Sequence, residues 1–139
     1  MQDSAAVLDE LGFTWSRLPS FQWKVGMIVY NPQSRRDEVI VSRFDSSNFH
    51  LASRDGGVVV AGTRWFLLMG CYPSLEREVN QGFLVSGLLH HFTHFSLLPM
   101  QDRSGYVLHL NGHDPIQRPT KIRALLAGWE QINVTPKLT

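Results

Sequence analysis

Apolar and polar residues alternate along several short segments between residues 23 and 70, and this pattern predicts β-strands. A period of two is what a strand with one or two buried faces produces. Turn residues separate the segments, and Asp55-Gly56-Gly57 is the strongest hairpin signal because glycine adopts positive φ without steric cost. Such short strands with regular turns predict a small barrel or sandwich. The expected strands are residues 25–30, 39–44, 49–53, 58–60 and 63–69.

A helical period of three to four residues replaces the alternation outside this block. Asp3-Ser4 can cap a helix that runs through Leu11, with Gly12 in the C′ position. Pro119-Thr120 opens a helix at 120–130 whose apolar stripe is expected to pack against the sheet. This stripe consists of Ile122, Leu125, Leu126 and Trp129. The other expected elements are a helix at 75–90, strands at 92–98 and 106–110, and an edge strand containing Ile132 and Val134.

Together these elements predict an α+β, mainly β, fold with residues 1–139 in a single domain. The block 23–70 resembles SH3-like, Tudor-like and KOW-like barrels. That resemblance is carried by Lys24-Val25-Gly26 leading into Ile28-Val29-Tyr30, a polar loop, the strand of Val39 to Val41, and Asp55-Gly56-Gly57 before Val58. It concerns architecture rather than membership of a family, and it implies a small SH3-like or Tudor-like antiparallel barrel with added helices.

Two segments flank this barrel-like block in the predicted organisation. Residues 1–22 form an N-terminal helical arm, which we expect to cover an open end of the barrel. Residues 71–139 contain a helix, a hairpin and the C-terminal helix.

Composition narrows the possible functions only a little. The 139 residues include 43% hydrophobic and 18% charged residues, which are values of a globular protein. Seven basic and seven acidic residues precede Gly70, and six basic and five acidic residues follow it, so neither half is a polybasic nucleic-acid module. The only cysteine, Cys71, excludes an internal disulfide and a cysteine-based zinc site. No signal peptide or long apolar stretch is present, so we expect a cytoplasmic protein without a membrane span.

Two pairs of histidines carry one candidate chemistry. The members of each pair are four residues apart and can share one face of a helix or a strand. Four imidazoles could therefore converge on a metal ion or act in acid–base catalysis. The sequence lacks HExxH and similar ligand spacings, so we expect neither a stoichiometric metal nor another cofactor. A small histidine-dependent hydrolase or metal-dependent enzyme remains the alternative, with His90, His94, His109 and His113 as its site.

Arginines and aromatic residues of the strand-rich block carry the favoured chemistry. Small barrels use arginine and exposed aromatic rings to grip single-stranded nucleic acid or the acidic groove of a protein. The Arg35-Arg36 loop has no apolar residue to anchor it and is expected to project from the barrel. The predicted partner-binding residues are Tyr30, Arg35, Arg36, Arg43, Arg54 and Trp65.

These observations favour a non-enzymatic interaction module, such as a small accessory, adaptor or inhibitor protein, that binds a macromolecular partner. A protein partner is preferred to nucleic acid, because the formal net charge is only +1 and binding to phosphates is largely electrostatic.

Overall fold

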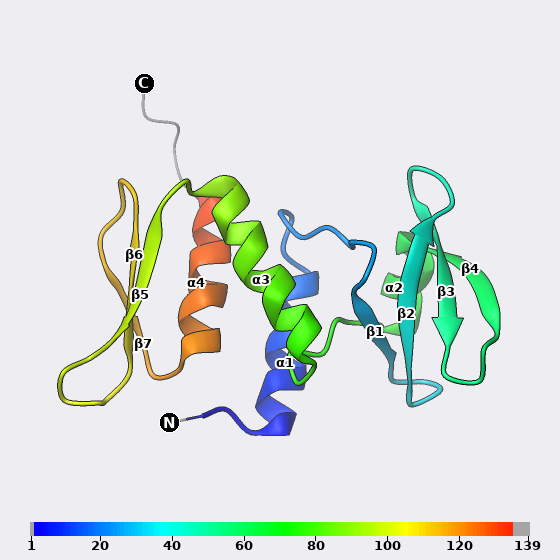
Figure 1. The fold of residues 1–139 in the computed structure, drawn as a ribbon, viewed down its shortest axis with the longest axis horizontal. Coiled ribbons are helices and arrows are strands. Elements are labelled where there is room, and N and C mark those ends of the chain that lie inside the picture. The colour runs from blue at the N-terminus through cyan, green and yellow to red at the C-terminus, as the bar shows by residue number, and fades with distance from the viewer. Residues whose placement is uncertain (1, 135–139) are drawn as a thin grey trace.

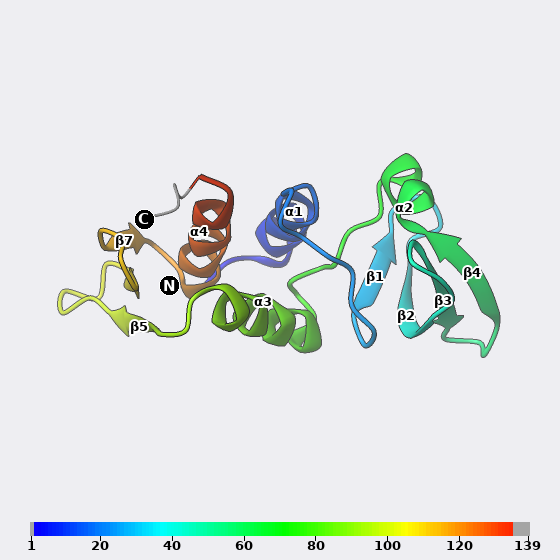
Figure 2. The same ribbon diagram turned by 90° about the horizontal axis from the view of Figure 1, so that it is seen from above.

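The computed structural model describes residues 2–134, which form two antiparallel sheets and four helices. The four-stranded sheet lies at one end of the molecule and the three-stranded sheet at the other, with α1, α3 and α4 between them (Figures 1 and 2). In chain order the elements are α1 (Ala5–Ser16), β1 (Ile28–Asn31), β2 (Arg36–Arg43), β3 (Asn48–Ser53), β4 (Val58–Gly62), α2 (Thr63–Met69), α3 (Glu78–His91), β5 (Phe95–Pro99), β6 (Tyr106–Leu110), β7 (Ile116–Arg118) and α4 (Lys121–Val134).

The prediction of an α+β fold with four antiparallel strands within residues 23–70 is confirmed. These strands form a meander in the order β1-β2-β3-β4, and no pairing of β1 with β4 closes it in the part of the chain that the structure describes. Each hairpin follows the turn chemistry of the sequence, with Gly56 at φ 88° between β3 and β4. In residues 2–134, no helix has the length and apolar character needed to cross a membrane.

Residues 63–69 form the helix α2 rather than the expected fifth strand. Its seven residues begin after Gly62 and end at Gly70, which adopts the left-handed conformation with φ 71°. The helix buries Phe66 against the ring of Phe49 on β3 and against the ring of Trp23 in the segment that precedes β1. A short apolar run carries too few residues to distinguish a buried strand from a helix by its period, which explains the error.

Two further predictions of helix boundaries are wrong. The first helix continues to Ser16, so Gly12 lies inside it rather than after its end. A Cβ at position 12 would lie 2.3 Å from the carbonyl oxygen of Pro73. Close packing, rather than helix termination, therefore requires this glycine. The edge strand expected at Ile132 and Val134 is instead the last turn of α4, and the short strand β7 was not foreseen.

A row of aromatic rings joins the helices to the four-stranded sheet. It starts at Trp129 of α4 and passes to Trp15 of α1 at a centroid distance of 5.4 Å. It continues along the segment between α1 and β1 and ends on β3. Successive contacts are Trp15–Phe21 at 4.9 Å, Phe21–Trp23 at 5.0 Å, Trp23–Phe66 at 4.8 Å and Phe66–Phe49 at 6.4 Å. The N-terminal arm thus contributes buried Trp15 and partly buried Phe21 to the core, and its role as a cover for an open barrel end stays a prediction.

Asn80 of α3 fastens the helical layer to the sheet by hydrogen bonds. Its side chain is fully buried, and its Oδ1 accepts a hydrogen bond of 3.0 Å from the backbone N–H of Ile28. Its Nδ2 donates to the carbonyl oxygens of Ile28 and Ser74, both at 2.9 Å. One side chain therefore satisfies both backbone groups of a β1 residue that face away from β2, as buried polar groups require.

Hydrogen bonds also join the residues before the first helix to the start of the last helix. The Asp3 carboxylate, which is 4% exposed, accepts hydrogen bonds from Thr120 Oγ1 at 2.6 Å and from Arg123 Nε at 3.0 Å. These contacts connect the residues before α1 with the first turn of α4, 117 and 120 positions along the chain.

The apolar stripe of α4 joins a core cluster that also contains residues of the four-stranded sheet, whereas α4 itself packs mainly on α3, β6 and β7. Trp129 is 5% exposed, and its Nε1 donates a hydrogen bond of 2.7 Å to the Leu84 carbonyl oxygen of α3. Its ring occupies the space left by Gly87, where a Cβ would lie 2.1 Å from the Trp129 Cζ2 atom. Ala124 and Gly128 lie instead against Leu108 of β6.

Replacing Trp129 tests the aromatic row. We expect Trp129→Ala to lower the free energy of unfolding by about 3–5 kcal/mol, because the change removes a buried ring and leaves a cavity beside Trp15. Urea denaturation measures this change. An unchanged midpoint would show that the ring is peripheral to stability.

Replacing Asn80 tests the attachment of α3 to the sheet. Asn80→Leu keeps the volume roughly constant but leaves the N–H and C=O of Ile28 without partners, so we expect a loss of about 3 kcal/mol. Gln117→Leu, which changes an exposed amide of β7 in the same way, is the matched control and should stay within about 0.5 kcal/mol of wild type. Equal losses in the two variants would contradict the role of Asn80.

Candidate functional site

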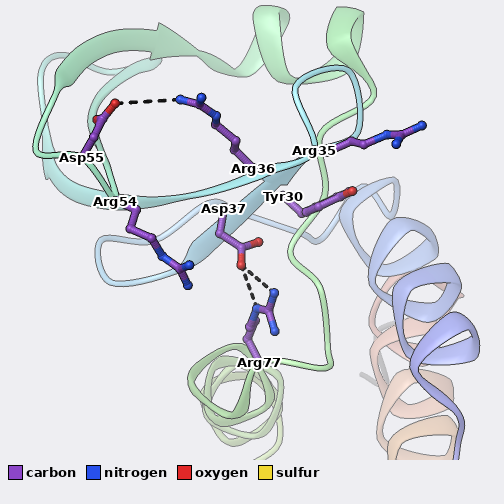
Figure 3. Close-up of a pocket in the computed structure, with 7 residues that line it drawn as sticks. All are labelled: Tyr30, Arg35, Arg36, Asp37, Arg54, Asp55 and Arg77. Carbon is purple, nitrogen blue, oxygen red and sulfur yellow. Dashed lines mark hydrogen bonds and ion pairs between the residues drawn. The ribbon is translucent and has the colours of Figure 1, made fainter.

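An arginine-lined cleft of about 550 Å³ lies beside the four-stranded sheet, at the junction with the start of α3 (Figure 3). Strands β1 and β2, the turns that follow β1 and β3, and the residue before α3 contribute its walls. The lining residues are Tyr30, Arg35, Arg36, Asp37, Arg54, Asp55 and Arg77.

Strand register places three of these side chains in one row. Tyr30 of β1 is the direct partner of Asp37 of β2. Glu38 of β2 pairs with Ser53, the last residue of β3. One step further along this antiparallel pair, Arg54 lies beside Asp37 and continues the row. Successive side chains of a strand alternate between its faces. The row therefore lies on the outer face of the sheet, opposite the inner face formed by buried Ile40 and Leu51.

The turn after β1 presents Arg35 in an unusual backbone conformation. Asn31 fixes this turn: its Oδ1 accepts a hydrogen bond of 2.9 Å from the N–H of Gln33, and its carbonyl accepts one of 2.7 Å from the N–H of Arg35. Arg35 itself has φ 58°, a region that a non-glycine residue occupies at a cost of about 1 kcal/mol or more. Arg36 and Asp37 already belong to β2, so the expected polar loop is shorter than predicted.

Ion pairs hold part of the cleft in place. Arg77, the N-cap residue of α3, donates to Asp37 Oδ2 from Nε at 3.0 Å and from Nη2 at 2.6 Å. Asp37 Oδ1 is enclosed without a hydrogen-bond partner among the described residues. Arg36 lies 3.9 Å from Asp55, and both side chains are about two-thirds exposed, so this pair is weak.

Asp55 is fixed mainly by its own turn. Its carboxylate accepts hydrogen bonds from the Ser53 hydroxyl and from the N–H of Gly57. These two hydrogen bonds, with a smaller contribution from Arg36, lower the pKa of Asp55. The carboxylate therefore stays negatively charged at neutral pH and does not depend on Arg36 to do so.

Two of the four guanidinium groups are free to meet a ligand. Within residues 2–134, the side chains of Arg35 and Arg54 make neither an ion pair nor a hydrogen bond. Figure 3 shows Arg54 and Arg77 near Asp37, whereas Arg35 points away from the ion pairs. With four arginines and two aspartates, the cleft carries an excess of positive charge and offers donors in the forked geometry that suits carboxylates.

Four of the six predicted binding residues line this cleft, and two lie elsewhere. Arg43 is at the far end of β2, where its guanidinium stacks 4.8 Å above the Phe49 ring and donates to the Ser46 carbonyl at 3.0 Å. Trp65 of α2 is half-buried beside Phe66. Sequence reasoning missed Arg77, because its approach to Asp37 depends on the packing of α3 on β1 across 40 residues of chain.

The four histidines of the alternative site are dispersed over the other end of the molecule. His90 lies in the last turn of α3 beside His91, which ends the helix, and His94 precedes β5. His109 lies on β6, and His113 contacts the Phe92 ring at 5.4 Å. No three His, Cys, Asp or Glu side chains in the described part of the chain lie close enough to hold a metal ion. His90, His91 and Trp129 do line a second cleft of about 520 Å³. The pKa of His91 is lowered, mainly because the ring is partly buried and to a smaller extent because His90 lies beside it.

Cys71 is fully buried, as its residue type suggested. Burial raises the pKa of its thiol to about 11, so the thiolate is scarce at neutral pH and the residue is a poor nucleophile.

Comparison with known proteins gives no additional guide to this site: no family model, curated protein or solved structure matches the chain.

A double-mutant cycle tests the ion pair that frames the cleft. Arg77→Ala and Asp37→Ala remove one partner each, and the double variant removes both. Because the two side chains are 41% and 29% exposed, water screens the pair, and we expect a coupling free energy of about 1 kcal/mol. Urea denaturation of the four proteins measures it. Fully additive losses would show that the contact contributes nothing to stability.

Proposed function

We propose that the chain is a non-enzymatic interaction module and that the arginine-lined cleft binds acidic side chains of a protein partner. The unpaired guanidinium groups of Arg35 and Arg54 carry this proposal. An acidic side chain that meets either guanidinium would gain charge-assisted hydrogen bonds without breaking an existing ion pair. Arg77 is already held by Asp37 and acts as a fixed wall of the cleft.

The backbone at Arg35 supports a role in binding rather than in folding. A glycine would adopt φ 58° without strain, whereas arginine does not. Strained positions cluster at functional sites, where the rest of the structure holds them in place. The side chain at this position stabilises no other part of the described protein by a polar contact, so its presence fits a ligand outside the chain.

The mixture of charges supports a protein rather than a nucleic acid as the partner. Asp37 and Asp55 lie among the arginines and would repel a continuous row of phosphates. A protein surface that carries both signs can complement such a cleft, and complementary charges give specificity more than raw affinity. The likeness of the β1–β4 meander to SH3-like or Tudor-like barrels remains part of this proposal, because those folds serve as small binding modules.

Removing the two unpaired charges tests the proposal. We expect Arg35→Ala/Arg54→Ala to keep the free energy of unfolding within about 0.5 kcal/mol and to weaken partner binding about tenfold. Partners would be captured from host extract on wild-type protein and on the variant, identified by mass spectrometry and then titrated in purified form at several salt concentrations. The remaining salt dependence should be shallower in the variant, because the steering charges are gone.

Lys24→Ala/Arg118→Ala is the matched control, because it removes two exposed charges outside the cleft. This control should capture the same partners as wild type. Arg35→Gly separates backbone strain from binding. Glycine adopts the positive φ without strain, so this variant should have a free energy of unfolding about 1 kcal/mol higher than wild type and yet bind the partner more weakly. Equal affinity of wild type and the double variant at low salt would contradict the proposal. A steep loss of affinity for a single-stranded oligonucleotide with rising salt would identify nucleic acid as the ligand instead.

A further inference from the structure

The two edges of the four-stranded sheet differ in how they are covered. At the β1 edge, Tyr30 and Tyr72 form a bridge in which each backbone N–H donates to the carbonyl of the other, at 2.8 and 3.1 Å. At the β4 edge, no further strand is paired within residues 2–134. Figures 1 and 2 show β4 at the outer end of the molecule, away from the helical layer.

The register identifies the backbone groups that this edge offers. Ser53 N–H donates to the Gly57 carbonyl at 2.9 Å, and Thr63 N–H donates to the Ser47 carbonyl at 3.1 Å. Hydrogen-bonded and non-hydrogen-bonded pairs alternate along an antiparallel ladder. The pair of Leu51 and Val59 lies two residues from the hydrogen-bonded pair of Ser53 and Gly57, so the N–H and C=O of Val59 also point towards β3. The N–H and C=O groups of Val58 and Val60 consequently point outward.

The edge also lacks the features that normally prevent strand addition. Natural edge strands carry lysine, proline or a bulge. The irregularity of this sheet lies in β2, between Ile40 and Ser42, and β4 is Val-Val-Val-Ala-Gly. Its three valines are 58%, 52% and 50% exposed, although β-branched residues are strongly favoured inside sheets.

We propose that β4 pairs antiparallel with β4 of a second copy of this chain, which joins the two four-stranded sheets into one eight-stranded sheet. The two-fold axis passes between Val59 and Val59 of the partner. Val58 then lies opposite Val60 of the partner in a hydrogen-bonded pair, and the same pair recurs on the other side of the axis. The segment Val58–Val60 is symmetric about Val59, so β-branched residues meet at these three positions, whereas Ala61 falls opposite Gly57 of the partner.

Charge complementarity at both ends of the strand favours a second copy as the occupant. The turn before β4 carries Asp55, and the first turn of α2 after β4 carries exposed Arg64. Antiparallel pairing brings the start of one β4 alongside the end of the other. Asp55 of each copy thus lies at the same end of the interface as Arg64 of the other, with opposite charges. Besides the hydrogen bonds within its own turn, Asp55 has one weak ion pair among the described residues, the 3.9 Å contact with Arg36.

Apolar residues on the outer face continue into the proposed interface. Val58 pairs with Ala52, Ala52 with Val39 and Val39 with Ile28, which makes one cross-strand row over all four strands. Val60 of the second copy would extend this row, so the pairing buries apolar side chains as well as backbone groups. A single strand on each side is a small contact, and we expect a dimer in reversible exchange with monomer.

Sedimentation velocity over about 5 to 500 µM protein tests the proposal, and we expect a monomer–dimer equilibrium for wild type. Val60→Pro removes an outward N–H but no hydrogen bond to β3, so it should abolish the dimer while keeping the urea midpoint close to wild type. Val59→Lys places two lysines opposite each other across the axis and should also give monomers. Val41→Lys, at a similarly exposed valine of β2, is the control and should dimerise as wild type does.

Charge reversal tests the register. Val59→Glu alone should be monomeric, because two carboxylates would meet at the axis. An equimolar mixture of Val59→Lys and Val59→Glu proteins should recover the dimer, because opposite charges then face each other. Wild type that stays monomeric throughout, a dimer that persists in Val60→Pro, or a mixture that stays monomeric would each overturn the proposal. The arginine cleft is left unaltered in all these variants, so the result is independent of partner binding.

Discussion

The arrangement of this protein depends on the junction between α3 and β1, where the buried amide of Asn80 satisfies both outward backbone groups of Ile28. An unpaired group in this position would destabilise the fold, so the helix can occupy only the place in which these bonds form. That place also puts Arg77, three residues earlier, within reach of Asp37. The position of one wall of the arginine cleft is thus a consequence of packing between helix and sheet.

The features that could be predicted from the sequence are those fixed locally. Turn residues such as Asp55-Gly56-Gly57 mark hairpins whatever surrounds them, and they placed β2, β3 and β4 within a few residues. Four cleft residues could be recognised because they lie on neighbouring strands, and the register of short hairpins brings them together. Sequence patterns could not reveal that residues 63–69 are helical or that Arg77 joins the cleft. The helix at 63–69 depends on the packing of Phe66 against Trp23 and Phe49. The position of Arg77 depends on the packing of α3 against β1.

The β3–β4 hairpin contributes to both proposed binding surfaces. Arg54 at its turn faces the cleft, whereas Val58 and Val60 form the free edge a few residues later. A symmetric pair of chains would therefore present two identical clefts on one continuous sheet. A partner with repeated acidic segments could engage both, and the second contact would then form at a high effective concentration. Modest affinity at a single cleft is compatible with firm attachment of such a partner.

The bond network of Asp3 with Thr120 and Arg123 has a consequence for how the chain acquires its structure during synthesis. The ribosome releases α1 first and α4 last among the described elements, yet Trp15 of the one helix packs on Trp129 of the other. A nascent chain that lacks α4 leaves the aromatic side of α1 exposed, and exposed apolar surface is what chaperones recognise and aggregation exploits. Translation must therefore proceed past α4 before the aromatic side of α1 is buried.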